Sequence, residues 1–328
     1  MLIFGIETSC DETACAIIKD GREVISNVVA SQIKTHEIFG GVVPEVAARE
    51  HLDTINVVIN ETFDIAKKEF NINPDDIDAF SSTAGPGLVG CLLVGLNAAK
   101  ALSLSYNKPF IGVNHLKAHV CANFLESDLK PPFICLLVSG GHTQVIKIDD
   151  YDKQEIIAST IDDATGEVYD KAARLMGLTY PGGIKLDKMA QAGNKYAFKL
   201  PEAKVKENEF SFSGLKTAVL RLVQSYRGKE LPVNDISASF QETITTTLIN
   251  KTKFLADKYN IKTIALSGGV AANSRLREKL FELQSEGYNT FAPKMKFCTD
   301  NAAMVASCAY FCPIKTDDSL ILEAFSRG

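Results

Sequence analysis

Two histidines in the segment Asn114-His115-Leu116-Lys117-Ala118-His119 are four residues apart. In a helix, this spacing places both imidazole rings on one face, one turn apart, where they suit two ligands of one metal ion. A metal site needs at least a third protein ligand, and Asp300 in Cys298-Thr299-Asp300-Asn301 is our candidate. The alternative interpretation is a polar helix face that binds no metal.

The same spacing of histidines begins the H-E-x-x-H motif of zinc peptidases. The general-base glutamate of that motif follows the first histidine, whereas Leu116 stands in its place in this chain. A zinc peptidase of that class is therefore disfavoured. Mixed nitrogen and carboxylate ligation with open positions suits Fe(2+) as well as Zn(2+), so the sequence does not choose between these ions.

Glycine-rich turns follow two apolar segments that read as strands. Ser139-Gly140-Gly141 follows Phe133–Val138, and Gly268-Gly269 follows Ile261–Leu266. Glycines at such turns let the backbone approach a ligand closely, and the N-terminus of a following helix offers N–H groups to an anion. These turns predict contacts with a phosphate, and the alternative is that the glycines only make tight turns.

Two carboxylates, Asp11 and Glu12, lie in the polar turn Glu7–Thr13 near the start of the chain. Carboxylates in such a position can orient water or assist removal of a proton from an attacking group. They can equally be turn residues, because aspartate favours turns by bonding to its own backbone. Both interpretations stay open at this point.

The elements that must position these groups occur twice along the chain. Leu2–Ile6 and Ala14–Ile18 predict a β-hairpin, and Phe133–Val138 with Gln144–Ile148 repeat the same plan. Each half also contains a later strand, glycine turn and helix. The intervening segment 126–132 carries charges and two prolines, which disfavour a helix or a central strand. We place the domain boundary there.

We therefore expect an α/β protein with a duplicated ribonuclease H-like, actin-like two-domain fold and a nucleotide cleft between the lobes. The expected domains are an N-terminal lobe at residues 1–130, with the histidine motif, and a C-terminal lobe at 131–328, whose last helix can pack back on the first lobe. Sugar kinases, actin and heat-shock ATPases share this plan, so an ATP-dependent phosphotransferase remains possible.

Composition limits the class of protein further. A hydrophobic content of 46% and a charged content of 23% are typical of soluble globular proteins. We see no basic leader and no apolar run of membrane-spanning length, so we expect a cytoplasmic protein. The 8 cysteines contain no C-x-x-C pair, which predicts reduced, mostly buried thiols and no cysteine zinc cage.

The net charge of −5 gives no general attraction to a nucleic-acid backbone. Any RNA contact would need a local basic surface or a partner protein. The best candidate for such a basic surface is a group of lysines and one arginine in the second half of the chain. Its alternative interpretation is an ordinary solvated face. The residues are Lys195, Lys199, Lys204, Lys206, Lys216 and Arg221.

Motifs along nearly the whole chain resemble, in the same order, those of the bacterial tRNA threonylcarbamoyltransferase (TsaD) family, once known as glycoproteases. They include the histidine motif, Gly5-Ile6-Glu7-Thr8-Ser9-Cys10-Asp11-Glu12-Thr13, Thr83-Ala84-Gly85-Pro86-Gly87-Leu88, Leu137-Val138-Ser139-Gly140-Gly141-His142-Thr143, Tyr180-Pro181-Gly182-Gly183 and Gly268-Gly269-Val270-Ala271-Ala272-Asn273. The chain departs from the family at Leu116 and Lys117, where bacterial members commonly carry a methionine and an acidic residue, and in the tail after Asn301.

The resemblance implies roles for particular residues. His115, His119 and Asp300 would be the metal ligands, and the ion would be Fe(2+) or Zn(2+). Asp11 and Glu12 would be the candidate catalytic carboxylates. Two groups of residues would bind the nucleotide substrate. The loop against its phosphate or carbamoyl end would comprise Leu137, Val138, Ser139, Gly140 and Gly141. The positions around its adenylate would be Asp170, Gly183, Asp187 and Asn273.

The reaction implied by the resemblance is transfer of a threonylcarbamoyl group from threonylcarbamoyl-AMP to the exocyclic amine of the adenosine next to the anticodon, in tRNAs that read codons beginning with A. AMP would be released. The implied partners are tRNA, a shorter actin-like paralogue subunit (TsaB) and a P-loop ATPase subunit (TsaE), with no membrane. The alternatives from other classes are an actin-like ATP phosphotransferase and a nucleotide-switched scaffold.

Overall fold

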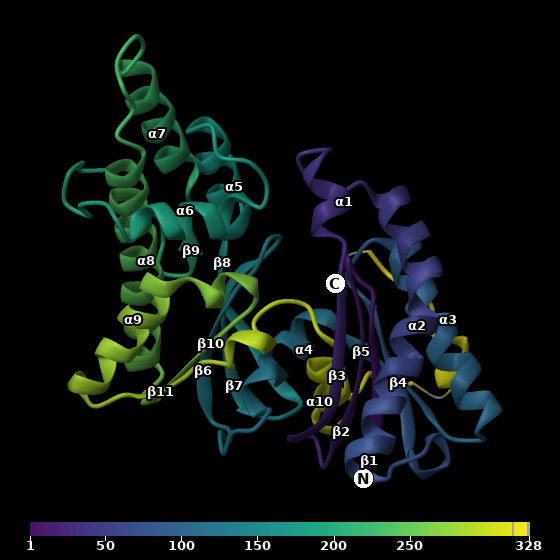
Figure 1. Ribbon diagram of the computed structural model, residues 1–328. Helices are drawn as coiled ribbons and strands as arrows, with labels where there is room; N and C mark the ends of the chain where they lie inside the picture. The colour runs from purple at the N-terminus through teal and green to yellow at the C-terminus, as the bar shows by residue number, and fades with distance from the viewer. Residues whose placement is uncertain (317, 327–328) are drawn as a thin grey trace. The chain divides into compact units, whose positions relative to one another are not determined.

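The computed structural model describes residues 1–316 and 318–326. These form two compact units, of which the first comprises Met1–Lys130 together with Thr299–Gly328 and the second comprises Pro131–Cys298. The chain therefore completes the second unit and then returns to the first with its C-terminal segment, drawn in yellow in Figure 1.

The first unit is built on a five-stranded sheet with the order β3-β2-β1-β4-β5. Its central strand, the apolar β1, is buried after its first residue and pairs antiparallel with β2 and parallel with β4. The β2–β3 pair is antiparallel and the β4–β5 pair is parallel. The strands are β1 (Leu2–Glu7), β2 (Glu12–Lys19), β3 (Glu23–Ser31), β4 (Ala79–Gly85) and β5 (Phe110–Asn114).

Helices cover both faces of this sheet. Successive residues of a strand point to opposite faces, so Gly5 and Ile6 of β1 face different layers. A Cβ atom on Gly5 would lie 2.7 Å from the Ala302 carbonyl oxygen, whereas one on Gly95 would lie 3.1 Å from Cγ2 of Ile6. The small residues thus let α10 and α3 pack closely on opposite faces. The helices are α1 (Ile33–Glu37), α2 (Pro44–Phe70), α3 (Val89–Ser105), α4 (His115–Cys121) and α10 (Ala302–Phe311), with short 3-10 turns at Pro74–Asp76, Ala122–Phe124 and Ser319–Ile321.

The second unit repeats the arrangement. Its six-stranded sheet has the order β11-β10-β6-β7-β8-β9. Strands β6, β7 and β8 are antiparallel neighbours, and β10 and β11 continue in parallel from β6. The strands are β6 (Phe133–Val138), β7 (Thr143–Asp150), β8 (Lys153–Thr160), β9 (Glu209–Phe210), β10 (Thr263–Ser267) and β11 (Asn289–Phe291).

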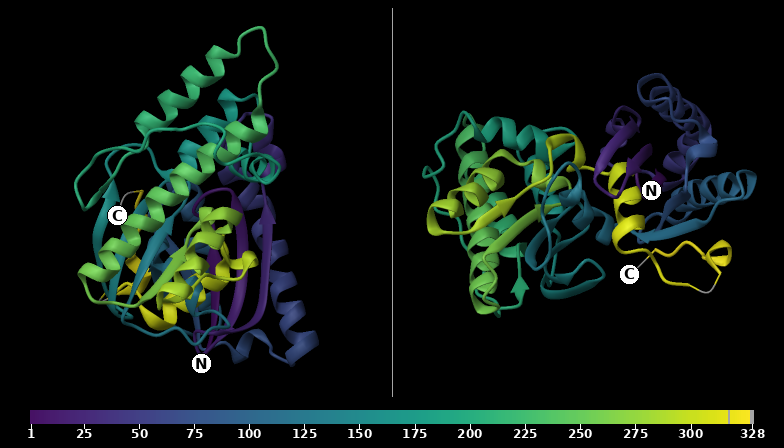
Figure 2. Two further views of the ribbon diagram at one scale, coloured as in Figure 1. Left: turned by 90° about the vertical axis from the view of Figure 1, so that its left-hand side faces the viewer. Right: turned by 90° about the horizontal axis from the view of Figure 1, so that it is seen from below.

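The core of the second unit forms where its helices pack on this sheet. The long helix α8 contributes Phe240, Ile244 and Leu248, which join Leu136 and Leu266 in one buried cluster. Figure 2 shows the helices of this unit from two further directions. They are α5 (Thr165–Leu175), α6 (Gly182–Ala190), α7 (Ser213–Ser225), α8 (Val233–Lys258) and α9 (Ser274–Glu282), with 3-10 turns at Gly269–Ala272, Leu283–Glu286 and Met295–Phe297.

The duplication predicted from the two hairpins is confirmed, because β1, β2, β3, β4 and β5 correspond in order and direction to β6, β7, β8, β10 and β11. One detail is wrong. The helix expected directly after Gly268-Gly269 is preceded by a 3-10 turn, and α9 begins at Ser274, where the Asn273 side chain accepts a hydrogen bond from the Leu276 N–H. Within the part of the chain that the structure describes, no helix combines the length and apolar character needed to cross a membrane.

Candidate functional site

Three side chains of the first unit bring potential metal ligands together. The helix α4 starts at His115 because the Asn114 side chain caps it, accepting from the N–H groups of Leu116 and Lys117. The next turn of the helix places His119 beside His115, with ring centroids 4.6 Å apart. Asp300, which lies two residues before α10, has its Oδ1 3.1 Å from Nε2 of His119 and 3.6 Å from Nε2 of His115. One ligand atom from each residue lies within 4.8 Å of the others.

A fourth residue, Glu7, supports this group and was missed by sequence reasoning. Its Oε2 lies 3.2 Å from Nδ1 of His115, and the buried carboxylate also accepts hydrogen bonds from the Ser9 N–H and the Thr83 hydroxyl. Metal-binding histidines commonly donate their second ring N–H to a carboxylate, which orients the ring and fixes its tautomer. Glu7 can hold His115 with Nε2 directed toward Asp300. The sequence signal that could have identified Glu7 is an acidic residue directly after an apolar run.

The two histidines are supported differently. His115 has Glu7 and the Ser9 hydroxyl near its Nδ1. Nδ1 of His119 is buried and makes no hydrogen bond within the described part of the chain. The ring of His119 is instead positioned by burial, since only 1% of its side chain is exposed. Packing therefore orients one ring, and hydrogen bonds orient the other.

The charges of the group are strongly coupled. Burial acts to lower the pKa of His115, but Asp300 and Glu7 raise it to about 9. Burial likewise acts to raise the pKa of Asp300, yet the two histidines lower it to about 2. For Glu7, the pairing with His115 outweighs burial and lowers the pKa. Two imidazoles and a carboxylate, with a further carboxylate behind them, are a donor set that fits a divalent cation.

Of the predicted catalytic carboxylates, Asp11 lies in the turn that precedes β2 and Glu12 is the first residue of β2. The side chain of Glu12 accepts a hydrogen bond from the Ser31 hydroxyl. Burial first, and then the carboxylates of Asp300 and Asp11, raise the pKa of Glu12 to about 10. The backbone of this turn is held by His51, whose Nε2 lies 3.0 Å from the Cys10 carbonyl oxygen and whose Nδ1 lies 2.7 Å from the Thr13 hydroxyl. The acidic turn is thus electrostatically linked to the histidine group.

In the second unit, the predicted phosphate loop is the turn between β6 and β7. The Ser139 N–H donates to the His142 carbonyl, and the Ser139 carbonyl accepts from the N–H of Gly166 in α5. Leu137 and Val138, also predicted in this loop, instead lie in β6, where they are fully buried and pair with Gln144 and Thr143 of β7.

The glycines of these turns fall into two kinds. A Cβ atom on Gly140 or Gly141 would meet nothing within 4 Å, and neither residue has a left-handed φ. A side chain at either position would therefore not force a left-handed backbone angle. Gly268 differs, because its φ is +88° and a Cβ would lie 2.3 Å from the Val138 carbonyl oxygen. Internal packing explains Gly268, but it leaves Gly140 and Gly141 free for contact with a ligand.

The residues predicted around the adenylate meet along α6. Oδ1 of Asp170, from α5, accepts a hydrogen bond from the Gly183 N–H, and burial raises the pKa of this carboxyl. One turn further along α6, Oδ1 of Asp187 accepts a hydrogen bond from the Ser274 hydroxyl at 2.7 Å. The same oxygen lies 3.3 Å from the amide nitrogen of Asn273. The structure thus places all four predicted residues in one region of the second unit.

Gln241 joins this network and was also missed by sequence reasoning. Its amide nitrogen donates to Asp187 at 2.8 Å, and its carbonyl oxygen accepts from the Asn273 amide at 2.9 Å. The residue comes from α8 and is buried. It fixes the orientation of both the Asp187 carboxylate and the Asn273 amide. A lone glutamine within a helix carries no distinctive sequence signal.

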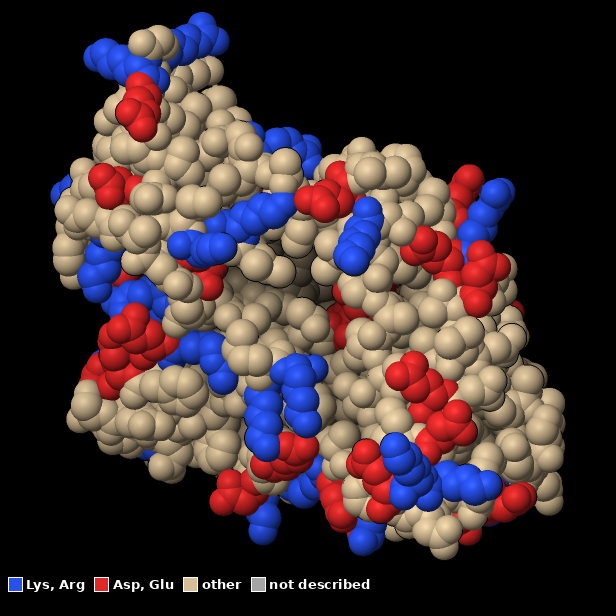
Figure 3. Space-filling view, viewed as in Figure 1, with Lys and Arg blue, Asp and Glu red and all other residues tan. Residues whose placement is uncertain are grey.

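Figure 3 shows one face of the molecule, on which basic and acidic side chains are mixed. The basic residues considered for RNA contact include two that form ion pairs. Lys206 pairs with Glu209, and Lys216 pairs with Asp163. Sequence reasoning missed two further basic residues of α5, Lys171 and Arg174. Together with residues of α7 they line a cavity of about 250 Å³, whose walls are Lys171, Arg174, Leu175, Lys216, Thr217 and Leu220.

Similarity to known proteins agrees with this arrangement. A family model for tRNA N6-adenosine threonylcarbamoyltransferase matches residues 23–307. A protein of that name from Caldicellulosiruptor saccharolyticus is 53% identical over 323 residues, covering 97% of this chain and 95% of the relative. Another from Gloeothece citriformis is 54% identical over 318 residues, covering 94% of this chain and 90% of the relative.

Solved structures support the fold. Component A of (R)-2-hydroxyglutaryl-CoA dehydratase from Acidaminococcus fermentans is similar with a TM-score of 0.54 and 17% identity, covering 94% of this chain and 98% of that one. HypF of T. kodakarensis is similar with a TM-score of 0.63 and 16% identity, covering 94% of this chain and 47% of that one. At these identities the likeness concerns the fold alone.

Proposed function

Because the chain belongs to the tRNA N6-adenosine threonylcarbamoyltransferase family, we propose that it transfers a threonylcarbamoyl group from threonylcarbamoyl-AMP to a tRNA adenosine. The acceptor is the exocyclic amine of the adenosine adjacent to the anticodon in tRNAs that read codons beginning with A. The observation that carries this proposal is the group formed by His115, His119 and Asp300 in a chain that matches the family over residues 23–307.

We assign the two units different tasks in this reaction. His115, His119 and Asp300 of the first unit would hold a divalent ion, with Glu7 orienting His115. Such an ion polarises a carbonyl group and offsets the charge of a phosphate. Fe(2+) and Zn(2+) both suit two imidazoles and one carboxylate with open positions, so we propose either of these ions.

The second unit would bind the adenylate. The backbone N–H groups of Gly140 and Gly141 can donate hydrogen bonds to the phosphate or carbamoyl end, and the absence of nearby atoms at the two glycines leaves room for it. Asp170 and Asp187 can accept from ribose hydroxyls. Gly183 gives close backbone access, and Asn273 contributes an amide beside Asp187.

In the transfer, the amine nitrogen forms a bond to the carbamoyl carbon while the bond from that carbon to the phosphate oxygen breaks. AMP leaves with the electron pair of the broken bond, and the amine loses one proton. We propose the turn with Asp11 and Glu12 as the place where that proton is accepted. Glu12 has a pKa of about 10 beside Asp11 and Asp300, so a cation at the histidine group would favour its ionised form.

We further propose that the chain works in the cytoplasm with partner proteins. A net charge of −5 provides little attraction for tRNA, which makes a subunit such as the actin-like paralogue a reasonable source of RNA contacts. The sequence has no P-loop lysine motif, which agrees with ATP hydrolysis by a separate P-loop ATPase subunit. The basic residues around the cavity of α5 and α7 are the candidate RNA contacts of this chain itself.

A direct test supplies purified chain with threonylcarbamoyl-AMP and tRNA, with and without the two partner subunits, and measures the modified nucleoside by mass spectrometry. We expect modified adenosine and one AMP per transfer. The proposal would be overturned if the complete mixture formed no modified nucleoside while the chain consumed ATP and phosphorylated a small molecule, because that result identifies a phosphotransferase. Nucleotide-dependent partner binding with neither reaction would identify a scaffold.

A further inference from the structure

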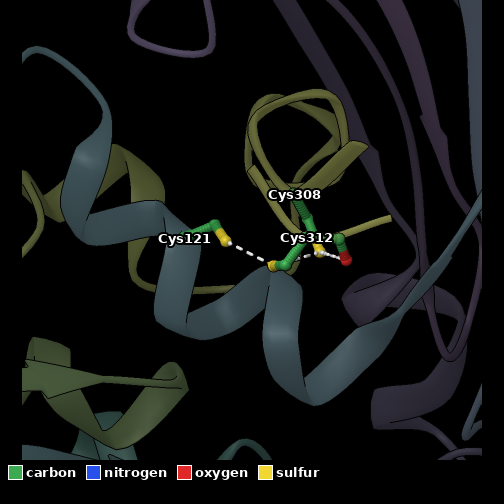
Figure 4. A group of neighbouring side chains, drawn as sticks. All are labelled: Cys121, Cys308 and Cys312. Carbon is green, nitrogen blue, oxygen red and sulfur yellow. Dashed lines mark hydrogen bonds between the residues drawn. The ribbon is translucent and has the colours of Figure 1, made fainter. Parts of the chain in front are cut away.

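Three cysteines of the first unit form a cluster that the proposed reaction does not use. Sγ of Cys312 lies 3.4 Å from Sγ of Cys121 and 3.5 Å from Sγ of Cys308. The three sulfur atoms all lie within 4.8 Å of one another, and at most 1% of each residue is exposed. Figure 4 shows the side chains converging from two helices. The spacing of the cysteines in the sequence predicted no such cluster.

The donor set favours a soft metal ion of low coordination number. Thiolate ligands select ions such as Cu(I) and Zn(2+). A structural zinc site is normally closed by four ligands, and this group contains three in the described part of the chain. A metal ion bound in a plane by three sulfur atoms, with bonds of about 2.3 Å, requires those sulfur atoms to lie about 4 Å from one another. Small rotations of the cysteine side chains would bring the sulfur atoms from their observed separations to this one. Three-coordinate Cu(I) therefore fits this set better than zinc.

The local electrostatics also favour a cation. Cys121 is the last residue of α4 and Cys312 directly follows α10, so two helix C-termini meet at the cluster. The carbonyl groups at such ends carry partial negative charge and stabilise cations. Burial holds the pKa of Cys308 well above the usual value, although the charge of Lys117 acts to lower it. Bare thiolates are thus unfavourable there, whereas thiolates bound to a cation are not.

We propose that Cys121, Cys308 and Cys312 form a second metal site that binds one Cu(I) ion. Each thiol that becomes a thiolate ligand releases one proton, and no change of oxidation state is needed. The site would join α4, which carries His115 and His119, to α10, which follows Asp300. Occupancy would therefore tie together the two helices that position the ligands of the first site.

The test uses the full chain under anaerobic conditions, titrated with Cu(I) in competition with the chelator bathocuproine disulfonate. We expect one tightly bound Cu(I) per chain, a higher melting temperature on binding, and an X-ray absorption spectrum with three sulfur ligands. The double variant Cys121→Ala/Cys308→Ala should bind Cu(I) at least about tenfold more weakly, since two of three ligands are lost. The matched control is Cys135→Ala, another buried cysteine, which should bind like the unmodified chain.

Three results would overturn the proposal. The first is equal Cu(I) binding by the double variant and the control. The second is an absorption spectrum of the unmodified chain with nitrogen ligands, together with loss of binding in His115→Ala, which would place the copper at the histidine group. The third is a disulfide among the three cysteines, found by alkylation and mass spectrometry of chain purified without air. The last two use chains with all three cysteines, so a folding defect of the double variant does not affect them.

Discussion

The two sheets of this chain have matching strand orders, yet the hairpin turns of their first two strands carry opposite chemistry. In the first unit, the turn between β1 and β2 ends with Asp11, followed by Glu12 as the first residue of β2, and the histidine group that interacts electrostatically with them includes the carboxylate of Asp300. In the second unit, the corresponding turn between β6 and β7 presents Gly140 and Gly141, whose N–H groups suit an anion.

The difference shows how one scaffold can serve two sides of a reaction. The strands determine where each turn lies, and the residues of the turn determine whether a cation or an anion is favoured. In our proposal, the different turns assign the metal to one unit and the phosphate to the other. Three sets of variants test whether the units divide the work in this way, and a fourth examines an ionic cluster outside both sites.

The largest effect is expected from loss of a metal ligand in the first unit. His115→Ala, His119→Ala or Asp300→Ala should lower nucleoside modification by about 1,000-fold or more and reduce bound metal, since each removes a direct ligand. Metal analysis of the purified variants and circular dichroism measure occupancy and folding. Lys117→Ala, in the same helix, is the control and should keep its metal. Full metal occupancy in all three ligand variants would remove the basis for the site.

A smaller effect is expected from Glu7→Gln, which keeps the shape of the side chain but weakens its hold on His115. Metal affinity should fall by about 10-fold to 100-fold, because the residue orients a ligand without binding the ion. Competition with a metal chelator measures this change. At a metal concentration that saturates the site, adenylate affinity should stay the same, since Glu7 belongs to the first unit and not to the predicted adenylate site. An unchanged metal affinity would show that packing alone orients His115.

In the second unit, Gly141→Val should weaken adenylate binding by about tenfold while the protein stays folded. The backbone tolerates a side chain at this position, so the loss would report on the space needed by the ligand. Calorimetry with a non-reactive adenylate analogue measures it. Gly268→Val is the contrasting variant and should destabilise the fold, because its Cβ would meet the Val138 carbonyl oxygen. Unaltered nucleotide affinity in Gly141→Val would identify that glycine as a turn former only.

The smallest effect concerns an ionic cluster of the second unit that lies outside both sites. Glu242 pairs with Arg275 and Lys279, and although burial acts to raise its pKa, these partners lower it to about 2. A carboxyl group with a lowered pKa stabilises the fold above its unfolded value near pH 4.5, and this stabilisation is lost as the pH falls toward 2.

Glu242→Gln should therefore lower the free energy of unfolding at pH 7 by about 1–2 kcal/mol. This value lies between the contributions typical of exposed ion pairs and of buried ion pairs. Urea unfolding at pH 7 and at pH 3 measures the difference between variant and unmodified chain, which should shrink at the lower pH. Modification activity should be retained at pH 7. An equal difference at both pH values would mean that the pairing contributes little and that the variant disturbs packing instead.

The sequence by itself was enough to predict the elements and many of the chemical groups. Continuous apolar runs around polar turns predicted both hairpins, because a strand covered on both faces buries nearly every residue and a turn favours glycine or aspartate. Two histidines four residues apart had to share a helix face once the segment was helical. The order of motifs along the chain was sufficient to indicate the family.

Only the tertiary structure decided which distant groups meet. Glu7 reaches His115, and Gln241 joins Asp187 to Asn273, because folding brings separate elements together at distances that spacing in the sequence does not encode. The same holds for Cys121 and Cys312, which lie at the ends of two helices and are not neighbours in a motif. Likewise, Gly140 and Gly268 read alike as letters, but the atoms packed around them distinguish open space from a contact that only glycine allows.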